Sequence, residues 1–255
     1  MDFRTAIFLF FAGVLGGALN SVAGGGGFIA FPALLFTGVP PIAANATQTV
    51  ALWCGVTASG GAYRNHLDVP RRVLVPLLIA SLVGGLLGAL LLLRTPAHTF
   101  LQVLPWLMLG ATLMFAFGHR LTALFRADLG NTATPAAITG ASIFELLVSV
   151  YGGYFGGGLG IMNLAMLSAI GMSDIHAMNA LKSVLGSAIN GVAVVTFLVA
   201  RAVYFKQAAV MIVGAILGGW FGAHYAQKLP ATWIRGFVIF VGASMSVYFF
   251  VRAYR

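Results

Sequence analysis

The sequence predicts an all-α polytopic membrane protein made of two homologous halves, and three observations predict it. Sixty per cent of the 255 residues are hydrophobic and only 7% are charged, whereas about 25% of a soluble domain is charged. Apolar runs of about 20 residues, the length that crosses a bilayer as a helix, recur along the whole chain. The two halves of the chain also resemble each other. Little sequence is left for a soluble domain.

Eight apolar runs define the elements that we expect. Backbone polar groups cannot stay unpaired in lipid, and the runs show no period-two alternation, so each is predicted to be a helix. The first run follows Arg4 and ends near the small residue Ala23, as in a signal peptide. Because its counterpart in the second half is internal, we interpret it as a retained helix. The runs cover residues 5–23, 42–62, 73–93, 98–117, 135–153, 175–200, 207–226 and 231–251.

Charge and motif content exclude several classes of protein. The net charge is +9, but the basic residues stand singly at the ends of the runs, as in membrane proteins and not in nucleic-acid-binding domains. The single cysteine, Cys54, permits neither an intrachain disulfide nor a cysteine metal site. No HExxH, GxSxG or P-loop motif is present. We therefore expect no enzyme activity, cofactor, metal or nucleic-acid partner. The partners that we expect include membrane lipid and a small anionic solute.

An internal repeat divides the chain. A shift of 133 residues aligns "AGGGGFIAFPALLFTG" at 23–38 with "GGGLGIMNLAMLSAIG" at 156–171, and a shift of 134 then aligns "GGLLGA" with "GGWFGA". We predict a first membrane repeat over 1–118, a connecting loop over 119–134 and a second repeat over 135–255. Duplicated halves with glycine-interrupted segments at matching positions are typical of secondary transporters.

Glycine clusters interrupt the apolar sequence at matching places. As one helix, residues 5–38 would extend about 50 Å, too long for one crossing of about 30 Å and too short for two. A helix break there would expose N–H groups at the positive end of a restarting helix, which favours an anion. Close helix packing is the alternative explanation. The two clusters are Gly24, Gly25, Gly26 and Gly27, and Gly156, Gly157 and Gly158.

Other glycines have GxxxG spacing, as in Gly13 and Gly17, Gly84 and Gly88, and Gly214, Gly218 and Gly222. We assign these to close packing between helices, and the same faces would allow a homodimer.

The number of elements in each half stays open at this point. If each broken segment crosses the membrane once, each half has four helices and most arginines fall on one side, as the positive-inside rule prefers. If the chain turns back at the break, each half has five elements and the repeats are inverted. Arg201, Lys206, Arg252 and Arg255 then lie on the opposite side.

Polar side chains lie at helical spacing in the runs that follow both clusters. Asn179, Lys182 and Ser183 share one face, and Asn45, Gln48 and Thr49 match them in the first half. A polar face on a membrane helix points to other helices or to a water-filled cavity. Either the Lys182 ammonium neutralises an anion there, or the long side chain carries its charge back to the membrane interface.

Glu145 is the only acidic residue inside an apolar run. A carboxyl group in that position either binds and releases a proton during transport or makes a hydrogen bond between helices. The sequence leaves both roles open.

The motifs "NSVAGGGG", "FPALLFTG" and "ANATQT", with the echoes "GGYFGGGLGIMNLAMLSAIG" and "AMNALKS", resemble the TauE/SafE family of sulfite-exporter-like permeases over nearly the whole chain. The resemblance implies a multi-pass transporter of small sulfur-containing anions, such as sulfite or organosulfonates, in the plasma membrane of a prokaryote. We expect an exporter that works by alternating access. A passive anion channel, or a permease for another small organic anion, is the alternative.

Combining the breaks with the polar faces, we expect the anion to contact Asn20, Gly24, Gly25, Gly26, Gly27, Asn45, Gln48, Thr49, Gly156, Gly157, Gly158, Asn179, Lys182 and Ser183.

Overall fold

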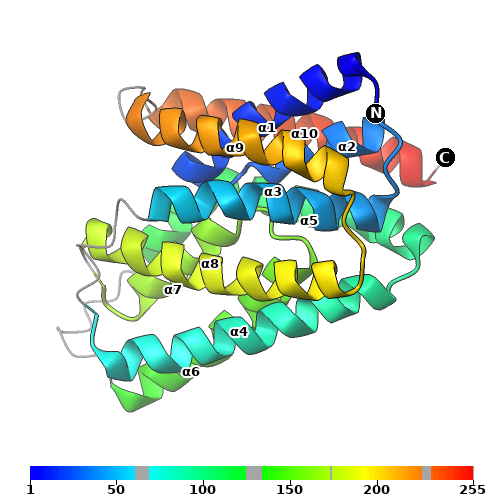
Figure 1. Cartoon of the computed structure of the whole chain (residues 1–255). Coiled ribbons are helices and arrows are strands. Elements are labelled where there is room, and N and C mark those ends of the chain that lie inside the picture. Colours follow the sequence, from blue (N-terminus) through cyan, green and yellow to red (C-terminus); the bar gives the residue numbers. More distant parts are fainter. Residues whose placement is uncertain (61–68, 125–133, 173, 226–230, 255) are drawn as a thin grey trace.

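The computed structural model describes residues 1–60, 69–124, 134–172, 174–225 and 231–254. These residues form ten helices and no strand (Figure 1), which confirms the all-α prediction. The eight predicted runs each correspond to one long helix, and the two short helices, α2 and α7, follow the glycine clusters. The helices are α1 (Phe3–Ala23), α2 (Gly27–Phe36), α3 (Pro41–Gly60), α4 (Arg71–Arg94), α5 (Ala97–Leu124), α6 (Pro135–Tyr154), α7 (Leu159–Ala169), α8 (Ile175–Val199), α9 (Phe205–Tyr225) and α10 (Ala231–Tyr254).

Seven of the described helices are long and apolar enough to cross a membrane. The exception among the eight long helices is α3, which carries the buried polar side chains of Asn45, Thr47 and Gln48. Those residues lower its hydropathy, and they also mark it as a helix that faces other helices.

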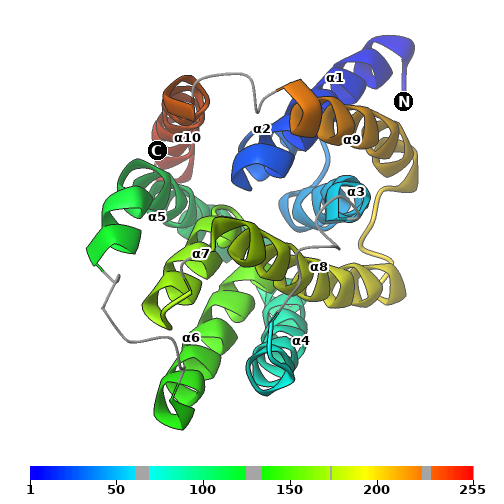
Figure 2. The same cartoon turned by 90° about the vertical axis from the view of Figure 1, so that its left-hand side faces the viewer.

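The chain reverses direction at the first glycine cluster. Helix α2 runs back along α1, because Gly26 lies against Gly16 and Asn20, and the Cβ of Ala30 would lie 3.5 Å from a Cβ added at Gly16. With ten residues, α2 extends about 15 Å, half the thickness of the hydrocarbon layer. The eleven-residue α7 likewise follows the second break and packs beside α6 (Figure 2). Each half therefore has five elements.

Helices that the predicted repeat pairs with each other run in opposite directions. Helix α3 is antiparallel to α8, because Trp53 donates a hydrogen bond to the carbonyl of Ser187 at 3.1 Å whereas Thr47 near the start of α3 accepts one from the Tyr204 N–H, beyond the end of α8. In the same way, Trp106 in the first half of α5 contacts Tyr254 at the end of α10. Both termini lie at one end of the molecule (Figure 1). Helices that the predicted repeat pairs are thus antiparallel, as expected of inverted repeats.

This arrangement decides between the two topologies. The link between α8 and α9 and the end of α10 lie at the end of the molecule that holds the termini, and the start of α4 lies at the other end (Figure 1). By sequence position, Arg201, Lys206 and Arg252 belong to the first group and Arg71 and Arg72 to the second. The four-helix version, which would gather the arginines on one side, is wrong. Basic residues stand at both ends of the bundle, as an inverted arrangement of the predicted repeats requires.

Close helix pairs interlock the two halves. Helix α1 packs on α9 and α4 packs on α6, while α3 and α8 lie next to each other between these pairs (Figure 2). Glycines make the close approach possible: a Cβ at Gly13 would lie 2.6 Å from the Met211 carbonyl oxygen, and one at Gly84 would lie 2.6 Å from that of Leu146. The packing role predicted for the GxxxG glycines is confirmed. Since these faces are used within the chain, the homodimer stays a prediction.

Substitution at one of these contacts is expected to destabilise the protein. In Gly88→Ala the new methyl group would collide with the carbonyl oxygen of Val150, and overpacking of this kind costs about 1–3 kcal/mol. Gly110 is the matched control, since a Cβ there meets nothing within 4 Å. Thermal unfolding in detergent measures both variants. A melting temperature that falls no more in Gly88→Ala than in Gly110→Ala would contradict the packing.

An aromatic cluster anchors the short helix α2. The fully buried Phe31 packs edge-to-face against Phe100 of α5 and Phe155 of the second glycine break, with ring centroids 6.1 and 6.3 Å apart. Its ring also lies 6.0 Å from that of Phe249 of α10. Ring contacts with three separate segments hold α2, and therefore the first break, in a fixed position.

Candidate anion site between the glycine breaks

The two glycine breaks meet inside the helix bundle. Gly24 ends α1 with φ 73°, and a Cβ at this residue would lie 3.6 Å from the Gly160 nitrogen and 3.7 Å from its Cα. In the second break, Gly158 has φ 77°. Residues other than glycine rarely adopt this left-handed backbone conformation, which explains why glycine stands at both reversals. Segments that are 136 residues apart, Gly24 and Gly160, are thus brought into contact.

Both half-helices begin without a side-chain cap. The N-cap residues are Gly26 for α2 and Gly158 for α7, and neither helix has a side-chain hydrogen bond at its start. The first N–H groups of a helix have no acceptor within the helix, and they form its positive end. Asn20 lies beside the first break, where its backbone carbonyl oxygen accepts a hydrogen bond from the Gly24 N–H at 3.1 Å.

The predicted polar faces of α3 and α8 make the same hydrogen bonds. Gln48 Nε2 donates to Asn45 Oδ1 at 2.7 Å, and Lys182 Nζ donates to Asn179 Oδ1 at 2.9 Å. Thr49 and Ser183 each donate a hydroxyl hydrogen bond, 2.8 Å long, to the backbone carbonyl four residues earlier. These last two hydroxyl groups are therefore occupied within their own helices.

Each long side chain also covers the first turn of the half-helix in its own half. A Cβ at Gly27 would lie 3.2 Å from Gln48 Oε1, and one at Gly160 would lie 3.4 Å from Lys182 Cδ. These contacts fall at positions that the sequence repeat aligns. The repeat itself stays a prediction, and the matching contacts support it.

Lys182 contacts the break through its stem and has no acidic partner. Its ammonium donates to a neutral amide oxygen, and in the described part of the chain no carboxylate pairs with it. A partly buried cation with a neutral partner can still gain a strong interaction with an anion.

Two further side chains near the breaks differ in what they bind. The Tyr151 hydroxyl donates to the carbonyl oxygen of Gly157 at 2.6 Å, so it satisfies a backbone group that the break exposes. Asn163 of α7 is completely buried, and neither atom of its amide has a partner among the described residues.

Glu145 lies between helices α6 and α4. The side chain is completely buried, and its Oε1 accepts hydrogen bonds from Ser81 at 2.6 Å and from Ser149 at 3.2 Å. No described residue binds Oε2. The interhelical hydrogen bond is thus present. Sequence reasoning missed Ser81, although it is the only hydroxyl side chain in the apolar run 73–93.

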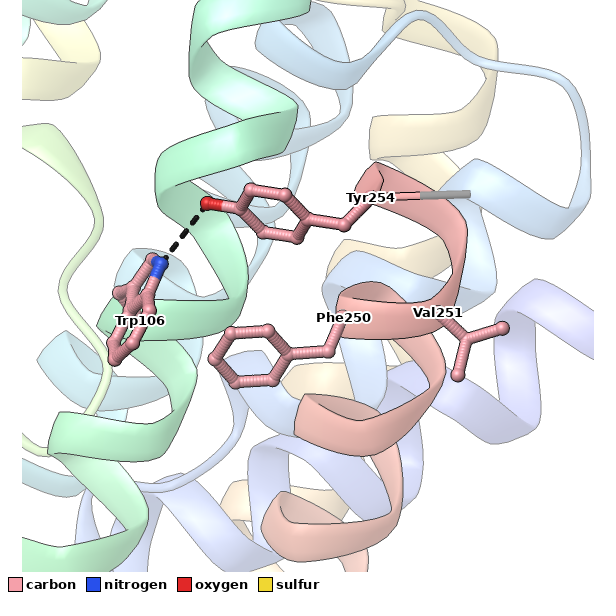
Figure 3. A pocket seen from close by; sticks show the side chains of 4 residues that line it. All are labelled: Trp106, Phe250, Val251 and Tyr254. Atoms are coloured by element: carbon pink, nitrogen blue, oxygen red, sulfur yellow. Dashed lines mark hydrogen bonds between the residues drawn. The ribbon is translucent and has the colours of Figure 1, made fainter.

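A groove on the outer surface is separate from these residues. It has a volume of about 550 Å³ and lies between α5 and α10, lined by Trp106, Phe250, Val251 and Tyr254. Figure 3 shows the hydrogen bond, 3.0 Å long, between Trp106 Nε1 and the Tyr254 hydroxyl. Trp106 and Tyr254 are both more than half exposed, as expected of aromatic residues that face lipid.

Comparison with known proteins gives matches over most of the chain. A Sinorhizobium protein named probable membrane transporter protein ORF9 is 29% identical, covering 97% of this chain and 93% of the relative. A probable membrane transporter protein of Haemophilus influenzae is 31% identical over 93% of this chain and 91% of its own. The probable membrane transporter protein YfcA of Escherichia coli K12 is 29% identical over 93% and 87%.

No solved structure matches the chain significantly. Residues 9–249 match the family described as "Sulfite exporter TauE/SafE". Together with the transporter relatives and the apolar helices, this match shows a multi-pass membrane transporter and not an enzyme. The chain belongs to the TauE/SafE family.

Proposed function

We propose that this protein is a secondary transporter that exports small sulfur-containing anions, such as sulfite or organosulfonates, by alternating access. The observation that carries the proposal is the contact between the two glycine breaks, beside a cation that pairs with no carboxylate among the described residues. The N-termini of the two half-helices supply the partial positive charge of their helix dipoles, and Lys182 supplies a full charge. Groups of this kind suit an oxyanion, which offers acceptors in several directions.

The substrate class and the location rest on the relatives. The family description names sulfite export, and the relatives described above come from bacteria, so we assign the protein to the plasma membrane of a prokaryote. A membrane potential that is negative inside drives anions outward. Export would therefore need no ATP-binding domain.

Alternating access fits the inverted arrangement of the helices. Antiparallel counterparts, such as α3 and α8, would let the site open to either side by exchanging the conformations of the two halves. The close pairs α1 with α9 and α4 with α6 each join one half to the other. Rocking would thus occur between these pairs, around the two breaks.

Thermal stabilisation tests the substrate class. The purified protein would be heated with sulfite, thiosulfate, sulfate, sulfoacetate, taurine, phosphate and chloride in turn. A ligand that binds the folded state raises the melting temperature as its concentration exceeds its Kd. We expect a sulfur-containing anion to give the largest shift. No shift with any anion of the panel would contradict the proposal.

Glu145 is proposed to bind and release a proton during transport. Its Oε2 has no described partner, and the basic side chains of the adjacent α4, those of Arg71, Arg72 and Arg94, are exposed at the helix ends. Lys182 of α8 instead bonds to Asn179, and α7 carries no charged residue. A buried carboxyl group without a counter-charge is best accommodated in its neutral form.

Glu145→Gln tests this role. Glutamine keeps an oxygen that can accept from Ser81 but cannot exchange a proton, so we expect anion exchange to persist while accumulation driven by a pH gradient is lost. In proteoliposomes, radiolabelled sulfite would report exchange and accumulation, and a pH-sensitive dye inside the vesicles would report proton movement. Asp2→Asn, at an exposed residue outside the bundle, is the control. Unchanged proton movement in Glu145→Gln would exclude the role.

A further inference from the structure

The carbonyl oxygen of the Gln48 side chain is a buried acceptor without a donor. The residue is 2% exposed, and no described group binds Oε1. Most buried polar atoms in folded proteins have a hydrogen-bond partner, and leaving one unpaired costs free energy. This exception therefore needs an explanation.

The orientation of the amide is fixed by its neighbours. The backbone oxygen of Tyr154 can only accept, so Asn45 must direct Nδ2 toward it, at 2.9 Å. Asn45 Oδ1 is then left as an acceptor, and Gln48 must present Nε2 to it, at 2.7 Å. Rotating either amide by half a turn would place two donors or two acceptors against each other. The free atom of Gln48 is therefore Oε1.

This oxygen lies at the first turn of α2. A Cβ added at Gly27 would come within 3.2 Å of it. At the equivalent place in the second half stands Lys182, whose ammonium has only donors. The two polar faces thus offer different groups near the breaks, a neutral acceptor from α3 and a cationic donor from α8.

An anion without a hydrogen-bond donor cannot satisfy the acceptor. Oxygen atoms of sulfate or of a simple alkylsulfonate would meet the lone pairs of Gln48 Oε1, so the ligand would lose its water without gaining a bond there and the buried oxygen would stay unpaired. A hydroxyl or amino group on the ligand would instead donate to it. The unpaired acceptor is thus a reason to expect selection between anions of equal charge.

We infer that the transported anion carries a hydrogen-bond donor, which Gln48 Oε1 accepts. The inference rests on the proposed function and narrows its substrates to hydroxy- or amino-substituted sulfonates and to singly protonated oxyanions such as hydrogen sulfite. The charged oxygens of the ligand face Lys182 and the half-helix N-termini. Gln48 Oε1 accepts a hydrogen bond from the hydroxyl or amino group of the ligand.

The test compares isethionate with ethanesulfonate, which differ only by a terminal hydroxyl group. Binding would be measured calorimetrically on the purified protein. We expect wild type to bind isethionate about tenfold more tightly, the effect of leaving one buried acceptor unpaired. Methionine has a side chain of similar length and no acceptor of comparable strength. In Gln48→Met the affinities for the two sulfonates should therefore be about equal. Ser246→Ala is the control, because this buried hydroxyl bonds within α10.

The binding results distinguish failure of the donor requirement from failure of the proposed function. Equal affinity of wild type for the two sulfonates would overturn this inference and leave the proposed function standing, and so would a tenfold preference that survives in Gln48→Met. Binding of neither sulfonate, nor of sulfite, would overturn both. If Gln48→Met is not recovered as folded protein, the comparison on wild type decides alone.

Discussion

Replacing Lys182 by alanine is expected to weaken the binding of sulfite by about 10- to 100-fold, the effect of losing a hydrogen bond to a charged group. The side chain has one hydrogen-bond partner among the described residues, the neutral oxygen of Asn179, and its stem covers Gly160 at the second break. An anion between the breaks would be left with neutral donors alone. The protein should still fold, because no described salt bridge is lost.

Lys182→Arg should keep part of the affinity, since the charge remains while the geometry of the donors changes. Titration of the purified variants with sulfite measures both effects. If both Lys182→Ala and Lys182→Arg bind sulfite as tightly as wild type, the lysine is not part of the site. Its ammonium would then lie at the membrane interface.

Gly24→Val is expected to abolish anion binding. Valine at φ 73° would strain the backbone by roughly 1–2 kcal/mol, and its side chain would occupy the contact with Gly160 of the second break. The reversal between α1 and α2 would change, and the N–H groups at the start of α2 would no longer point to the same place.

Gly38→Val is the matched control. Gly38 also has a left-handed backbone, φ 84°, but a Cβ there meets nothing within 4 Å. Both variants should therefore lose similar stability to strain, and only Gly24→Val should lose the ligand. Retained affinity in Gly24→Val, or equal loss in both, would argue that the breaks serve folding and not binding.

Much of the fold follows from local sequence. The apolar run at 73–93 predicts α4 (Arg71–Arg94) within two residues, because hydrophobic length is a strong signal in a membrane. The direction of the chain after the glycines does not follow. Arginines at both ends of the bundle do not decide it, and the reversal depends on contacts such as Gly26 with Gly16.

The candidate site divides in the same way. Helical spacing places Gln48 and Lys182 on faces with their asparagines, and the structure confirms those hydrogen bonds. Ser81 and Gly160 could not be assigned to their partners, because the register between distant helices is absent from a single sequence. The free oxygen of Gln48 likewise depends on Tyr154, 109 residues from Asn45.

Counterflow of radiolabelled sulfite in proteoliposomes tests the central claim most directly. Vesicles loaded with unlabelled sulfite should take up the label in a saturable manner, with rates that fall strongly in Lys182→Ala and in Gly24→Val but not in Gly38→Val. Such exchange requires a site that is open to one side at a time. A large flux that neither saturates nor responds to internal sulfite would show a channel, and the absence of flux with every sulfur-containing anion would contradict the account.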